Sequence, residues 1–174
     1  STHCISSAAS DVYKRQGVVV GPLVNQKAVD KVDELVRDAL DRGATAQLGG
    51  APADRDGYFY PATVLTGVPA EAQMGSAEIF GPVAAITEFD TEEEAIALAN
   101  DTPFGLISYV FTQGLDRGLR VSEALEAGMV GLNQGVVSNP AAPFGGIKES
   151  GVGREGGFTG IDEFLETKYI GIKV

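Results

Sequence analysis

The chain has 174 residues and a mass of 18.1 kDa, the size of one ordinary domain and long enough to bury a core without disulfides or metals. Acidic side chains outnumber basic ones 24 to 13, for a formal net charge of −11, so we expect neither nucleic acid nor a membrane surface as a partner. No apolar run reaches the roughly 20 residues of a membrane span. One cysteine, Cys4, and one histidine, His3, exclude a disulfide framework and argue against a Cys/His zinc site, so no metal is expected.

Residues 1–16, STHCISSAASDVYKRQ, show neither helical nor strand periodicity and lack the apolar core of a signal peptide. We interpret them as foreign to the protein, translated from sequencing-adapter sequence at a truncated gene end; the alternative is a flexible native N-terminus. Cys4 beside His3 resembles a nucleophile and its base. We reject that interpretation because sequence neighbours are not held at reaction geometry by their adjacency.

From Gly17 onward, strand and helix patterns follow one another. Asn25 is a candidate N-cap for a helix that carries apolar residues at helical spacing and ends at Gly43. A strand is expected at 58–65; Pro61 interrupts it, so we expect it at a sheet edge. The remaining expected elements are strands at 45–48, 83–89, 106–111 and 129–133, and helices at 91–100 and 114–127. Thr91 and Glu94 form a capping box at the start of the second helix. After Asn133, Gly and Pro dominate to about residue 160, followed by a helical turn at 161–166 and a strand at 169–174.

Helices between successive strands predict an α/β fold with a parallel sheet and crossover helices. In such sheets, loops at the carboxyl ends of strands carry the functional site. Gly151 to Gly156 matches the dinucleotide pattern G-x-G-x-x-G, but no apolar strand precedes it and too few residues follow, so we interpret the match as accidental.

Two short segments are candidates for binding. In Glu78-Ile-Phe80-Gly81-Pro82, the carboxylate and the ring would share one side of an extended chain, which suits a ribose, and Gly81 permits close backbone approach. In the loop 138–146, Ser138 could donate to an anionic ligand and Phe144 could line a channel. Pattern alone favours plainer explanations: a surface glutamate beside a core phenylalanine, and an ordinary Pro/Gly connection.

Together, GPLVNQKAV, GYFYPATVL, EIFGPV, NDTPFGLISYVFT, AGMVGLN, APFGGIKESGVGREGG and YIGIKV resemble, in order and spacing, the C-terminal third of the NAD(P)-dependent aldehyde dehydrogenase family. The resemblance covers residues 17–174, and the details are closest to the succinate-semialdehyde branch. It implies oxidation of a small aldehyde to a carboxylic acid with NAD or NADP, through a cysteine thioester hydrolysed by a glutamate-activated water. The family's nucleophilic cysteine and general-base glutamate lie upstream, so we expect no catalytic residue here and no activity from this chain alone.

The resemblance also implies roles for the two segments. Glu78 binds the nicotinamide ribose and Phe80 packs beside the nicotinamide; Phe144 lines the aldehyde tunnel and Ser138 hydrogen-bonds the substrate carboxylate. It divides the chain into the doubtful segment 1–16, the C-terminal part of the catalytic domain at 17–149, a Gly-rich bridge at 150–164 and an oligomerisation strand at 165–174. The full-length protein is then expected to be a cytoplasmic homo-oligomer, a dimer or tetramer. The alternatives are another semialdehyde dehydrogenase, for example one acting on glutarate semialdehyde, and a non-catalytic module that keeps the fold.

Overall fold

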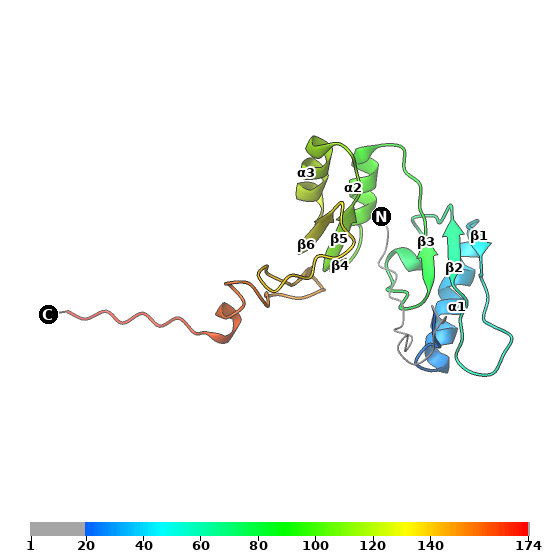
Figure 1. Ribbon diagram of the computed structural model, residues 1–174, viewed down its shortest axis with the longest axis horizontal. Helices are drawn as coiled ribbons and strands as arrows, with labels where there is room; N and C mark the ends of the chain where they lie inside the picture. The colour runs from blue at the N-terminus through cyan, green and yellow to red at the C-terminus, as the bar shows by residue number, and fades with distance from the viewer. Residues whose placement is uncertain (1–19, 174) are drawn as a thin grey trace. The chain divides into compact units, whose positions relative to one another are not determined.

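The computed structural model describes residues 20–173 and divides into two compact units, up to Asp101 and from Thr102 onward. Figure 1 shows the helices and strands of both. The first unit contains α1 (Gln26–Asp41), β1 (Thr45–Leu48), β2 (Thr63–Thr66), the 3-10 helix η1 (Gln73–Gly75), β3 (Val83–Ala85) and α2 (Glu92–Asn100). The second contains β4 (Phe104–Gly105), β5 (Ile107–Val110), α3 (Leu115–Ala124), β6 (Met129–Leu132), β7 (Ile147–Lys148) and the 3-10 helix η2 (Asp162–Phe164).

Helix α1 begins and ends where its sequence predicts. The Asn25 side chain accepts a hydrogen bond from the N–H of Ala28 at 3.0 Å, as an N-cap does. At the other end, Gly43 adopts a φ of 106°, a left-handed conformation that stops the helix. Both predicted boundaries of this helix are confirmed.

The sheet of the first unit has the strand order β1-β2-β3. β1 pairs with β2 antiparallel, and β2 pairs with β3 parallel. The predicted edge strand at 58–65 is wrong in two respects: only residues 63–66 form a strand, and that strand lies in the centre of the sheet. Pro61 lies before the strand begins, so the missing N–H of proline interrupts no ladder and gives no reason for an edge position. β3 is also shorter than the predicted 83–89: it pairs with β2 only from Val83 to Ala85, and β2 ends at Thr66, directly before Gly67, whose φ is 61°.

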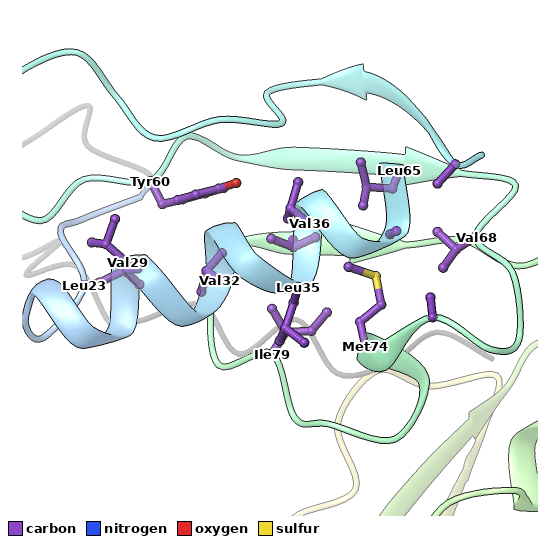
Figure 2. Packing of buried hydrophobic residues seen from close by; sticks show 14 residues of the cluster. Leu23, Val29, Val32, Leu35, Val36, Tyr60, Leu65, Val68, Met74 and Ile79 are labelled. Atoms are coloured by element: carbon purple, nitrogen blue, oxygen red, sulfur yellow. The ribbon is translucent and has the colours of Figure 1, made fainter. Parts of the chain in front are cut away.

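The core of the first unit lies between α1 and the sheet. Figure 2 shows the apolar face of α1, with Val32 and Val36 fully buried, against Leu65 of β2. Met74 of η1 and Ile79 of the segment that leads to β3 complete the same cluster. The segment that carries Glu78 and Phe80 is therefore fastened to the core through the residue between them.

Helix α2 starts at the predicted capping box. The N–H of Glu94 donates to the Thr91 hydroxyl oxygen at 3.1 Å, and the Glu94 carboxylate accepts from the N–H of Asp90 at 2.9 Å. The Thr91 hydroxyl thus satisfies a donor that has no partner within the helix, while the Glu94 carboxylate turns back to Asp90, one residue before the N-cap that a standard capping box would use.

The second unit contains the predicted parallel crossover. β5 and β6 pair in parallel, from Ile107 opposite Met129 to Val110 opposite Leu132, and α3 connects them. α3 covers this pair through Gly118, which is buried; a side-chain carbon there would lie 2.9 Å from Leu132 Cδ1. The α/β class with parallel strands is confirmed.

The Gly- and Pro-rich region after β6 contains one short ladder. β7 pairs antiparallel with β4, and the expected helical turn near 161–166 is present as η2. Residues 169–173, predicted as a strand, form none within the described chain and are exposed; Figure 1 shows them as an extended trace. A strand needs a partner for its hydrogen bonds, and no segment within residues 20–173 pairs with this one.

Candidate functional site

Glu78 and Phe80 lie on the solvent side of the segment between η1 and β3. Glu78 is exposed, Ile79 is buried, and the ring of Phe80 is 61% exposed. The predicted common side of the two residues is consistent with this alternation. The alternative of a core phenylalanine is wrong. The sequence argument assumed an extended chain here. Phe80 instead adopts a φ of 52°, so the chain is not fully extended at this position.

Two contacts hold this segment against α1. The Lys31 ammonium donates a hydrogen bond to the backbone carbonyl of Glu78 at 2.6 Å. Gly81 is buried against the same helix: a side-chain carbon at this position would lie 2.6 Å from Val32 Cγ2. The predicted close approach at Gly81 is thereby confirmed, and its partner is α1.

A third attachment lies at the start of η1. The Asp38 carboxylate accepts from the N–H of Gln73 at 2.8 Å and from its side-chain amide at 3.1 Å, while Arg42 Nε donates to it at 2.9 Å. The Gln73 backbone hydrogen bond, followed by that of Arg42, lowers the pKa of Asp38. The sequence reveals only the i,i+4 pair of Asp38 and Arg42; nothing in it indicates Gln73, which lies 35 positions away.

The exposed side chains of Glu78 and Phe80 suit a polyol attached to a flat ring. The Glu78 carboxylate accepts no hydrogen bond within residues 20–173, so both oxygens are available to neighbouring hydroxyl groups. The exposed ring of Phe80 provides an apolar face beside it. The nicotinamide ribose that the resemblance implies fits this pair.

Ser138 lies in the loop that follows β6 and is exposed. The loop begins at Asn133, whose side chain makes two hydrogen bonds to the backbone of Thr112. Sequence reasoning missed Asn133. The signal available was an asparagine directly after a strand, a position where Asn tolerates a left-handed backbone.

Phe144 is half-buried and held by its backbone. Its N–H and carbonyl pair with Glu155, at 2.7 and 2.8 Å, in an antiparallel bridge. The neighbouring Arg154 donates from Nη1 to the carbonyls of Gly146 and Gly153, at 2.7 Å each. The glycine-rich segment thus forms a folded support for the Phe144 loop. No α-helix follows Gly156 among the described residues, so the segment is not the strand-turn-helix of a dinucleotide fingerprint.

The candidate residues divide between the two units of the structure. Glu78 and Phe80 belong to the first unit, and Ser138 and Phe144 to the second. Cys4 and His3, and the interpretation of residues 1–16, lie outside the described residues.

Within residues 20–173, no three His, Cys, Asp or Glu side chains gather as ligands for a metal ion. In the same part of the chain, no helix is both long and apolar enough to cross a bilayer.

Both the backbone and the sequence of this chain are similar to those of known proteins. One solved structure, an NADP-dependent enzyme of E. coli, superposes with a TM-score of 0.85 at 50% identity, over 90% of this chain and 32% of that one. A succinate-semialdehyde dehydrogenase of Paenarthrobacter nicotinovorans is 55% identical over 153 residues, which are 88% of this chain and 34% of the relative. A glutarate-semialdehyde dehydrogenase of Pseudomonas aeruginosa is 50% identical over 154 residues, 88% of this chain and 32% of the relative.

The chain therefore spans about a third of the length of the relatives it matches. The family model for the aldehyde dehydrogenases matches residues 8–170, a range that includes part of the segment interpreted above as foreign. With nearly the whole sequence matched, the chain belongs to the aldehyde dehydrogenase family.

Proposed function

We propose that this chain forms the nicotinamide rim and the substrate entrance of an enzyme that oxidises succinic semialdehyde to succinate with NAD or NADP. The observation that carries the proposal is the exposed pair Glu78 and Phe80: a carboxylate that accepts no hydrogen bond from any of the described residues, beside an exposed ring. The two semialdehyde dehydrogenases among the similar proteins support the substrate class.

In this proposal each segment has a separate task. The Glu78 carboxylate accepts hydrogen bonds from the ribose hydroxyls, and Phe80 packs beside the nicotinamide, which takes up the hydride when the cofactor is bound. Ser138 donates a hydrogen bond to the carboxylate at the far end of the substrate, and Phe144 lines the passage of the aldehyde. The nucleophilic cysteine and the general base are supplied by other parts of the full-length enzyme.

The cofactor role is tested by Glu78→Gln in the full-length enzyme. The amide keeps the size of the side chain but replaces a two-oxygen acceptor by one acceptor and one donor, so KM for NAD(P)+ should rise roughly tenfold. Glu88→Gln is the matched control, because Glu88 is also exposed but lies outside the proposed site. An equal KM for NAD(P)+ in both variants would contradict the role of Glu78.

The substrate role is tested by Ser138→Ala, with Ser138→Thr as the control that keeps a hydroxyl. The alanine variant should raise KM for succinic semialdehyde far more than KM for butanal, because only the former has a carboxylate to lose a hydrogen bond. Equal effects on the two aldehydes would exclude carboxylate recognition by Ser138. The second candidate substrate is glutaric semialdehyde, which the Pseudomonas aeruginosa relative supports. Its kcat/KM, measured in parallel with that of succinic semialdehyde, shows which of the two the enzyme prefers.

The 174-residue chain by itself is proposed to be inactive. NAD(P)H formation from succinic semialdehyde by the purified chain would refute this. The DNA upstream of codon 17 separates the proposal from the alternative of a non-catalytic module: an in-frame continuation that encodes a cofactor domain and a cysteine supports an enzyme. A native start codon and an unrelated N-terminus support the module.

We also propose that the full-length enzyme is a dimer or tetramer joined through residues 165–174. Tyr169, Ile170 and Ile172 are 91%, 71% and 81% exposed, an unusual position for apolar side chains in extended chain. Light scattering of the full-length enzyme with and without these residues tests this: an unchanged mass would contradict it. A cytoplasmic location stays a prediction from the sequence.

A further inference from the structure

Asn133 connects the ends of two neighbouring strands. Its backbone N–H donates to the carbonyl of Val110 at 2.8 Å. Its side-chain oxygen accepts from the N–H of Thr112 at 2.8 Å, and its side-chain nitrogen donates to the carbonyl of Thr112, also at 2.8 Å. The side-chain amide thus acts as a peptide group of a paired strand would, and it extends the β5/β6 pairing beyond Leu132.

The backbone of Asn133 turns the chain out of the sheet. Its φ is 53°, in the left-handed region that Asn enters more readily than other residues with a side chain. A left-handed residue directly after a strand changes the direction of the chain, so β6 ends here and the loop to Ser138 begins.

The loop then folds back over Gly131, the buried glycine two residues earlier. A side-chain carbon at Gly131 would lie 2.9 Å from Val137 Cγ1 and 3.0 Å from the carbonyl oxygen of Gln134. The loop therefore occupies the space that a side chain at 131 would fill. Ser138 follows Val137 directly and is exposed.

We propose that Asn133 is the positioning residue of the substrate loop: its paired hydrogen bonds to Thr112 hold residues 134–137 over Gly131, so that Ser138 is presented in one orientation. Asn133 itself touches no substrate. The inference rests on the proposed function, in which Ser138 binds the anionic end of the aldehyde.

Two substitutions separate the amide from the backbone turn. Asn133→Gly can keep the left-handed backbone, which glycine adopts freely, and it removes both side-chain hydrogen bonds to Thr112. Asn133→Asp keeps the acceptor for the Thr112 N–H but sets a carboxylate oxygen against the Thr112 carbonyl oxygen. It should therefore weaken the contact to Thr112 at least as much as Asn133→Gly does. Asn25→Gly is the control, because it too replaces an asparagine that hydrogen-bonds to the backbone, but it removes one such bond where Asn133→Gly removes two, and it lies in the first unit.

The first measurement uses NMR on the 174-residue chain and needs no activity. In Asn133→Gly, amide exchange of Thr112 should become about tenfold faster, as one hydrogen bond is lost. The {1H}–15N NOE of Val137 and Ser138 should fall, whereas Asn25→Gly should change neither. Unchanged exchange and NOE in Asn133→Gly would overturn the proposal.

The second measurement compares two aldehydes in the full-length enzyme. Asn133→Gly should raise KM for succinic semialdehyde about tenfold relative to KM for butanal, with kcat for butanal changed by less than about twofold. Equal losses for both aldehydes would show a merely structural role and overturn the proposal. If Ser138→Ala shows no selective loss, the proposed role of Ser138 fails; the NMR result then still tests the loop contact, but Asn133 no longer positions a binding residue.

Discussion

Gly81→Ala tests how the cofactor segment is attached to α1. The added carbon would lie 2.6 Å from Val32 Cγ2 and 3.3 Å from Val32 Cγ1, whereas carbon atoms in contact are normally about 3.5–4.0 Å apart. Either α1 or the segment must move by about 1 Å. Val32 is fully buried and β-branched in a helix, so it has no free rotamer to escape into. Overpacking of this kind costs about 1–3 kcal/mol.

Urea unfolding of the chain, followed by far-UV circular dichroism, measures the free energy of unfolding. Gly135→Ala is the control, because a side-chain carbon at Gly135 meets nothing within 4 Å. Val32→Ala completes a double-mutant cycle: it removes both clashing carbons and leaves only Val32 Cβ, at 3.6 Å, an ordinary contact. Gly81→Ala should therefore cost almost nothing when Val32 is already alanine.

Two results would refute the reasoning. The first is a Gly81→Ala chain as stable as the Gly135→Ala chain, which would mean that the segment is not packed on α1. The second is additive costs in the double mutant, which would place the strain elsewhere. In the full-length enzyme, Gly81→Ala should also raise KM for NAD(P)+, since the displaced segment carries Glu78 and Phe80.

Thr91→Ala should destabilise α2 by about 1 kcal/mol, whereas Thr91→Ser keeps the hydroxyl that caps the helix. Hydrogen exchange of the α2 amides measures both variants, and equal exchange rates in the two would contradict the capping role of Thr91. Because the pKa of Asp38 is lowered from 3.8 by Gln73 and Arg42, its contribution to stability is present above the unfolded pKa and is lost as pH falls through the folded one. Asp38→Asn should therefore flatten the acid side of a melting-temperature profile below about pH 4, and an unchanged slope would refute this. Within residues 20–173, the buried Tyr60 hydroxyl makes no hydrogen bond of ordinary geometry, so Tyr60→Phe should leave thermal stability within about 1 kcal/mol of the parent or raise it. Burial, with Asp33, raises the pKa of Tyr60 above 10.0, so the parent should lose stability as pH rises beyond 10, and Tyr60→Phe should lose less of it.

The elements with local causes were predictable. The ends of α1 follow from Asn25 and Gly43, and the start of α2 follows from Thr91 and Glu94, because caps and helical glycines act within a few residues. The parallel pairing of β5 and β6 also followed from the helix between them, since a crossover is needed to return to the same strand direction.

Elements that depend on pairing were predicted less well. Pro61 predicts an edge position for the strand expected at 58–65, but the strand that forms, β2 (Thr63–Thr66), pairs with β1 on one side and β3 on the other. Strand order depends on which segments pair in the folded chain. The residues of one strand do not indicate which other strands will pair with it. For the same reason residues 169–173 have the pattern of a strand in the sequence and yet pair with no other segment in the part of the chain that the structure describes.

The candidate site divides in the same way. The sequence alone determined which residue types stand at Glu78, Phe80, Ser138 and Phe144, and that Gly81 allows a close approach, because composition and spacing are properties of the chain itself. Only the tertiary structure decided what holds them: Lys31 and Asp38 of α1 for the first pair, Asn133 and Arg154 for the second. Those hydrogen bonds join positions as far as 47 residues apart, and such a partner is selected by packing, which a one-dimensional pattern does not contain.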